Sequence, residues 1–165
     1  IRCLREMETS SEDLAGQEQV RVFESVREAA EFLSTTEGKI LITTGSKELK
    51  EYTKIGNYQE RCFARVLSTK AAMEESVRLG FEGKHLIAMQ GPFSEEMNLA
   101  LLHQTRARYF VTKESGKAGG FEEKLKAAKK AGAVLIVIGR PQERGRSVQE
   151  VCHFIESNFG KKEQE

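Results

Sequence analysis

Short apolar runs recur about every 23 residues along this chain of 165 residues, and this spacing restricts the fold more than any other feature. Five runs have the length of a strand, at 40–42, 62–67, 85–89, 109–111 and 134–138. Segments with helical spacing of apolar residues separate them, at 46–53, 69–79, 94–103 and 121–131. This alternation is typical of parallel strands joined by right-handed crossovers.

The runs are almost continuously apolar, as expected of strands that are covered on both faces. We therefore predict an α/β fold, with a doubly wound, mainly parallel sheet of about five strands flanked by helices. A stretch at 19–23 would add a sixth strand at the N-terminal edge and lead into a helix at 25–33. A last helix is expected at 147–159, packed back onto the sheet.

Charge and composition exclude several classes of function. Lys and Arg total 26 against 25 Asp and Glu, so the net charge of +1 gives no global argument for binding nucleic acid or a membrane surface. No apolar run approaches the ~20 residues that span a bilayer. The three cysteines and three histidines are scattered without metal-ligand spacing, so we expect no metal site and a reducing, cytoplasmic setting. The chain begins at Ile1 without Met, which we interpret as a cut from a longer protein.

Ligands of open α/β sheets bind beyond the carboxyl ends of the strands, so the loops there are the candidate site. The loop after 40–42 contains Thr44, Gly45, Ser46 and Lys47. Gly45 permits close backbone approach, Ser46 can cap the following helix, and Lys47 stands near a helix start, where it is better suited to an anion than to the helix. The alternative is a well-capped turn with a surface lysine.

The loop after 85–89 contains Gly91, Pro92, Phe93 and Ser94. Ser94 is a candidate cap for a helix that is rich in early carboxylates, as the positive end of a helix dipole prefers. Phe93 can stack on a planar ligand ring, or it can act as a hydrophobic staple onto the following helix. Both interpretations stay open at this point.

The last two loops add glycines, hydroxyls and basic groups. They contain Thr112, Lys113, Ser115, Gly116, Gly119, Gly120 and Arg140. Glycine-rich loops at a helix start suit phosphate or carboxylate, although a merely flexible loop is the alternative. Lys or Arg at three strand exits predicts an anionic ligand. No Ser-His-Asp set, carboxylate pair or Cys-His dyad occurs in these loops, so hydrolytic and nucleophilic chemistry are not supported.

The loops also carry a family resemblance. LITTGSK at 41–47, RVL at 65–67, AMQGPFS at 88–94, TKESG at 112–116 with Gly119 and Gly120, and GRP at 139–141 follow one another in the order found in precorrin-6A reductases. The chain resembles the C-terminal half of that family, and cobalt-precorrin-6A reductases share the pattern. Members reduce a double bond of a corrin precursor with NADPH and have two α/β halves, with cofactor and tetrapyrrole in the cleft between them.

The resemblance implies that this chain is one wall of an NADPH and tetrapyrrole cleft, and that a missing N-terminal half supplies the other. It divides the chain into a linker or hinge region at 1–19, an α/β C-terminal domain at 20–160 and a frayed tail at 161–165. The fragment alone is then expected to be inactive. Lys113 and Ser46 are weak candidates for the proton donor, and the residues of the loops for cofactor or substrate binding. The alternative is a non-catalytic α/β module that binds a phosphorylated or carboxylated small ligand.

Overall fold

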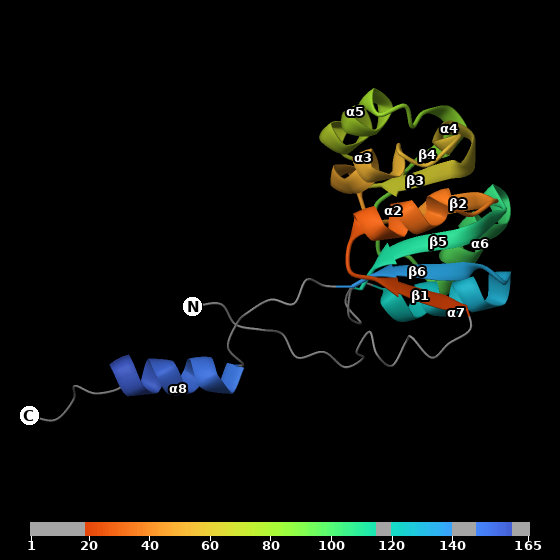
Figure 1. Ribbon diagram of the computed structural model, residues 1–165. Coiled ribbons are helices and arrows are strands. Elements are labelled where there is room, and N and C mark those ends of the chain that lie inside the picture. The colour runs from red at the N-terminus through yellow and green to blue at the C-terminus, as the bar shows by residue number, and fades with distance from the viewer. Residues whose placement is uncertain (1–18, 115–119, 140–147, 160–165) are drawn as a thin grey trace, which may run out of the picture. The chain divides into compact units, whose positions relative to one another are not determined.

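The computed structural model describes residues 19–114, 120–139 and 148–159. These residues fall into two units, one with the described residues up to 139 and the other with the C-terminal helix. The first unit is a six-stranded, all-parallel sheet with helices on both faces (Figure 1). The predicted α/β fold is thus confirmed, and the sixth strand is present at an edge of the sheet.

The strands lie in the order β1-β6-β5-β2-β3-β4. They are β1 (Val20–Phe23), β2 (Lys39–Ile42), β3 (Cys62–Val66), β4 (Leu86–Ala88), β5 (Ala107–Lys113) and β6 (Val134–Ile138). β4 is shorter than the predicted 85–89, because the 3-10 turn η2 (Gly83–His85) precedes it. β5 extends beyond 109–111 at both ends.

The helices of the first unit are α2 (Val26–Ser34), α3 (Leu49–Tyr52), α4 (Tyr58–Arg61), α5 (Lys70–Arg78), α6 (Glu95–Thr105) and α7 (Phe121–Ala131). The four longer helices, α2, α5, α6 and α7, lie within or close to the predicted segments. A hydroxyl side chain caps three of them, from Ser25, Thr69 and Ser94. The helix predicted at 46–53 is divided into the 3-10 turn η1 (Ser46–Glu48) and α3, and α4 was not predicted.

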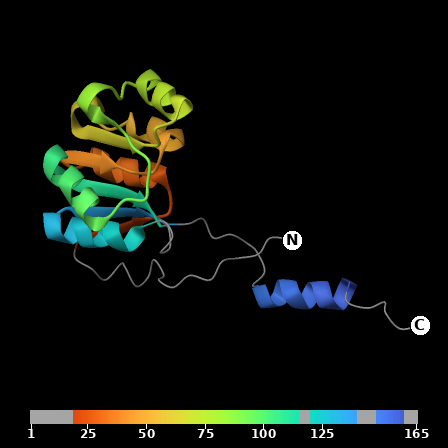
Figure 2. The ribbon, with the colours of Figure 1, turned by 180° about the vertical axis from the view of Figure 1, so that it is seen from behind.

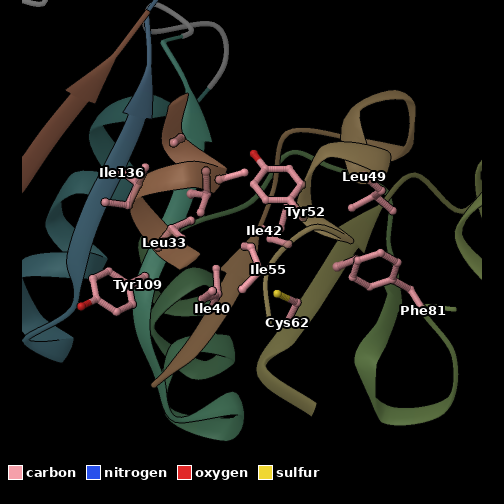
Figure 3. Close-up of a cluster of buried hydrophobic side chains, with 14 of the residues drawn as sticks. Leu33, Ile40, Ile42, Leu49, Tyr52, Ile55, Cys62, Phe81, Tyr109 and Ile136 are labelled. Atoms are coloured by element: carbon pink, nitrogen blue, oxygen red, sulfur yellow. The ribbon is translucent and has the colours of Figure 1, made fainter. Parts of the chain in front are cut away.

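Side chains of each central strand alternate between two apolar layers. Ile40 and Ile42 pack with α2 and α3, whereas Leu41 packs with α6 and α7. Figure 1 shows α2, α3 and α5 over one face, and the reverse view in Figure 2 shows α6 and α7 over the other. Figure 3 shows the first layer, with Tyr52 and Cys62 beside Ile42. Burial on both faces explains the continuous apolar runs.

The helix predicted at 147–159 is present as α8 (Val148–Phe159). Its side chains include Ile155, which is half exposed, and the exposed Cys152. The expected packing of this helix onto the sheet stays a prediction, as do the boundaries of the linker, domain and tail. In the described part of the chain, no helix is both long and apolar enough to cross a membrane.

Candidate functional site

The sheet has a switch point between two neighbouring strands. β2 and β5 pair with each other, yet the chain leaves β2 toward β3 on one side and leaves β5 toward β6 on the other. Crossovers that diverge in this way leave a crevice beyond the carboxyl ends of the two strands, where open α/β sheets bind ligands. The loops that follow β2 and β5 therefore define the candidate site.

The loop after β2 is tied to β5. The N–H and Oγ1 of Thr43 both donate to the carbonyl oxygen of Val111, at 2.9 and 2.7 Å. Gly45 has φ at 93°, a conformation that favours glycine. The predicted cap by Ser46 is wrong, because Ser46 is already the first residue of η1 and Gly45 holds the cap position without a side chain. Lys47 is exposed, as a ligand-binding lysine would be.

Thr44, which precedes Gly45 in this loop, points into the protein. Thr44 is buried, and its hydroxyl bonds to the Tyr52 hydroxyl with 3.3 Å between the oxygens. Burial raises the pKa of the fully buried Tyr52, so its phenol stays neutral. The hydroxyl of Thr44 is thus engaged inside the protein, and a role for Thr44 in ligand binding would rest on its backbone.

Lys113, at the end of β5, reaches back across the switch point to η1. Its Nζ lies 2.8 Å from Oε1 of Glu48, in an ion pair whose side chains are 48% and 31% exposed. The other carboxylate oxygen of Glu48, Oε2, is buried without a hydrogen-bond partner. This predicted anion ligand is therefore already paired with a carboxylate of its own chain, which the sequence did not single out.

The loop after β4 gives Phe93 a contact that neither interpretation included, and both interpretations stay predictions. The Phe93 ring covers the guanidinium of Arg65, with 3.9 Å from Cζ to the ring centroid. A Cβ on Gly91 would lie 3.2 Å from the ring, so the missing side chain leaves room for this stacking. The Ser94 cap is confirmed, since its Oγ accepts from Met97 N at 3.2 Å.

Arg65 is a charged residue inside a buried strand, and its side chain points to the α6 and α7 layer, like Phe63 two residues earlier. Only 5% of it is exposed. One guanidinium N–H donates to Oδ1 of Asn98 at 2.8 Å, and the Asn98 amide donates to backbone oxygens of Ser94 and Phe93. Burial lowers the pKa of Arg65 to about 10, so it stays charged at neutral pH, and no carboxylate within the described ranges pairs with it.

Lys124 is a second buried cation, on the first turns of α7. Its exposure is 8%, and its Nζ donates to Oγ1 of Thr112 at 3.0 Å. Burial, and then the nearby charge of Arg65, lowers the pKa of Lys124 to about 8, against a smaller opposing effect of Glu123. We call Arg65 and Lys124 the buried cation pair.

The buried cation pair was missed in the sequence, although each residue has a signal. Arg65 interrupts an apolar strand, and Lys124 stands at helical spacing from Phe121 and Ala128. A charged side chain in such a position is expected to be buried, and charged side chains are rarely buried unless they are paired.

The predicted site residues are brought together in part. The loops that contain Gly45, Lys47 and Lys113 meet at the switch point, and Phe93 and Thr112 contact the buried cation pair. Gly120 begins α7 with φ at 65°, and a Cβ on it would lie 3.8 Å from the Phe93 carbonyl oxygen. The described structure does not extend to Ser115, Gly116, Gly119 or Arg140. Among the described residues, no three His, Cys, Asp or Glu side chains gather as a metal site.

A comparison with known protein families identifies the family of this chain. The family model for precorrin-6x reductase CbiJ/CobK matches residues 1–156. The chain belongs to this family. This family is the one that the loop motifs resemble.

Curated relatives and a solved structure agree with this assignment. The chain is 40% identical over 134 residues to a cobalt-precorrin-6A reductase of Priestia megaterium, covering 78% of this chain and 52% of that protein. It is 38% identical over 117 residues to the enzyme of Salmonella typhimurium, covering 71% and 44%. A CobK precorrin-6A reductase structure aligns with a TM-score of 0.65 and 18% identity, over 98% of this chain and 63% of that chain, and supports the fold alone. The chain thus spans about half the length of these curated relatives.

Proposed function

We propose that this chain is the C-terminal part of an NADPH-dependent precorrin-6A or cobalt-precorrin-6A reductase of cobalamin biosynthesis, acting in the cytoplasm. In this proposal it forms one wall of the cleft for cofactor and tetrapyrrole, and an N-terminal half forms the other. The observation that carries it is the gathering of basic and hydroxyl groups at the β2 and β5 switch point, in a chain whose relatives are reductases.

The residues beyond the carboxyl ends of β2 and β5 suit the anionic groups of both NADPH and the tetrapyrrole. A precorrin carries acetate and propionate carboxylates, and NADPH carries a pyrophosphate and a 2′-phosphate. Lys47 is exposed beside the loop glycine Gly45, and the buried cation pair, from β3 and α7, adds two positive charges on the α6 and α7 side of the sheet. Such groups bind carboxylate and phosphate through charge-assisted hydrogen bonds.

NADPH, when bound, supplies the hydride, and reduction also needs a proton at the neighbouring carbon. Lys113 lies at the switch point in its ion pair with Glu48 and is the first candidate donor of that proton, with Ser46 the second. The apolar layers beneath the loops keep water from the strand ends, where Thr44 and Thr112 are buried.

The test is an assay of NADPH oxidation with precorrin-6A and its cobalt form. We expect no turnover from the 165-residue chain and full turnover once the upstream half of the natural protein is restored. Full activity of the chain alone would contradict the one-wall proposal, and an inactive whole protein would contradict the reductase proposal. NADP binding to the whole protein, measured by thermal shift, serves as the positive control for folding.

A further inference from the structure

We propose that Arg65 and Asn98 are positioning residues for the reduction. They fix the loop at 89–94 beside the switch point, and they act on the bound ligand through that loop. This deepens the proposed function and rests on it for the reaction. It assigns a role in the reaction to a strand residue and a helix residue, outside the loops in which site residues were predicted.

The loop at 89–94 borders the switch point although it begins far from it. β4 is at the edge of the sheet, three strands from β5, which places their backbones about 14 Å apart. The loop nevertheless ends beside the start of α7, the helix that follows β5, since a Cβ on Gly120 would lie 3.8 Å from the Phe93 carbonyl oxygen. The chain therefore passes β3 and β2 between β4 and α6, and a displacement of this loop would change the shape of the crevice.

Arg65 contacts the loop through the ring of Phe93. Its guanidinium lies against that ring, with 3.9 Å from Cζ to the ring centroid. The same guanidinium donates to Oδ1 of Asn98 at 2.8 Å. A planar guanidinium can stack with its face and donate within its plane at once, which the ammonium group of a lysine cannot do. The position therefore requires an arginine rather than a positive charge alone.

Asn98 connects the guanidinium to the backbone of the loop. It is fully buried on α6, and its amide donates to the carbonyl oxygens of Ser94 and Phe93 at 2.8 and 3.4 Å. The end of the loop is thus held at one ring and at two carbonyl groups, by residues of a strand and a helix. A loop that is ordered before the ligand arrives loses less entropy on binding.

Packing alone does not explain a charged residue inside β3. Buried residues flank Arg65 along the strand, and burial lowers its pKa to about 10, so the charge is desolvated at a cost. Apolar residues of similar volume can replace buried charged groups without loss of stability in many proteins. We infer that the fixed loop is what Arg65 supplies in return for this cost.

The first experiment measures the loop without a reaction. Hydrogen exchange of the loop amides is followed by mass spectrometry in the whole protein. We expect Arg65→Met to speed exchange at 89–94 about tenfold, since the contacts that hold the loop closed are lost. The matched control is Lys39→Met, which removes a cation 5.6 Å from the ring of Phe63 at the opposite end of the sheet and should leave this exchange unchanged. Unchanged exchange in Arg65→Met overturns the proposal.

The second experiment measures the reduction of precorrin-6A by NADPH with the same variants of the whole protein. We expect Arg65→Met to lower kcat/KM about tenfold or more, since a misplaced loop misaligns the bound ligand. Arg65→Lys should restore part of this loss, and Lys39→Met should match the natural protein. A raised KM for NADPH, for precorrin-6A or for both supports the proposal and identifies the ligand that the loop contacts. Faster loop exchange with unchanged kcat/KM overturns it, because the role of Arg65 is then structural only.

Phe93→Leu tests whether Arg65 acts through the loop. If it does, the double variant of Arg65→Met and Phe93→Leu should lose no more kcat/KM than the worse single variant. Losses that multiply in the double variant contradict this route. Arg65→Lys and Phe93→Leu also cover the case in which Arg65→Met does not fold. A natural whole protein without turnover would contradict the reductase alone, and the exchange measurement would still decide whether Arg65 fixes the loop.

Discussion

Two pairs of charged residues lie at the carboxyl edge of the sheet, and they differ in what surrounds them. Lys113 and Glu48 form a half-exposed ion pair of opposite charges. Arg65 and Lys124 are like charges, both buried, held by an amide, a ring and a hydroxyl. Water screens the first pair and makes its contribution to stability small, whereas burial penalises the charges of the second, as the lowered pKa values of Arg65 and Lys124 indicate. The comparison shows that exposure, more than the presence of charge, separates the two pairs: one is screened by water and the other is desolvated.

The largest effect on this comparison is expected from Asn98→Asp. A carboxylate 2.8 Å from Arg65 would pair with the guanidinium and cancel its charge. Affinity of the whole protein for NADP should fall by about tenfold to a hundredfold, with the pKa of Arg65 raised. Calorimetric titration measures it, and Asn57→Asp, at an exposed position, controls for the change in net charge. Equal affinity of Asn98→Asp and Asn57→Asp would contradict the electrostatic argument.

Lys124→Met tests the cost of the buried charge in the absence of ligand. We expect it to raise the free energy of unfolding at pH 7 by about 1 to 3 kcal/mol, since a pKa near 8 in the folded state lies below the ordinary value of 10.5. Lys129→Met should change it by less than about 0.5 kcal/mol. Denaturant melts measure both, and a Lys124→Met protein less stable than the natural chain would contradict a penalty of this sign.

The difference in free energy of unfolding between Lys124→Met and the natural chain should also depend on pH, with a definite sign. Below pH 8 Lys124 carries its proton in both states, so the penalty is fully present. Between pH 8 and 10.5 the folded state releases the proton first, and the stability of the natural chain should rise relative to Lys124→Met. The charges of Arg65 on β3 and Glu123 on α7 both act on the pKa of Lys124, and both residues are present in both proteins. A stability difference that stays constant from pH 7 to 10 would show that Lys124 is not desolvated.

Glu48→Gln should have the smallest effect. It breaks the half-exposed pair with Lys113, and we expect a loss of stability below about 1 kcal/mol. Freed of its carboxylate, Lys113 should bind anions slightly better, by about twofold to threefold in titration. Weaker anion binding in this variant, or a loss comparable with that of Asn98→Asp, would reverse the ranking of the two pairs.

The fold was predictable because its signal is periodic. Strands covered on both faces read as apolar runs, and the runs at 62–67 and 134–138 match β3 and β6 closely. The short elements were less predictable, since η2 and α4 depend on local turns such as the left-handed Asn57, which has no apolar periodicity to mark it.

The site was predictable only for residues in loops. Lys113 and Gly45 were predicted as site residues because the exit of a parallel strand suggests a ligand site by itself, and their role in binding stays a prediction. The ion pair of Lys113 with Glu48 joins residues far apart in the sequence, and the stacking of Phe93 on Arg65 joins two strand exits. Such pairings follow from the order of the strands, which the spacing of the runs alone does not determine.

The most direct test of the proposed function is NADPH oxidation with precorrin-6A and its cobalt form, measured on the 165-residue chain and on the whole protein side by side. The proposal predicts turnover by the whole protein and none by the 165-residue chain. An inactive whole protein that binds NADP, or full turnover by the 165-residue chain alone, would contradict it.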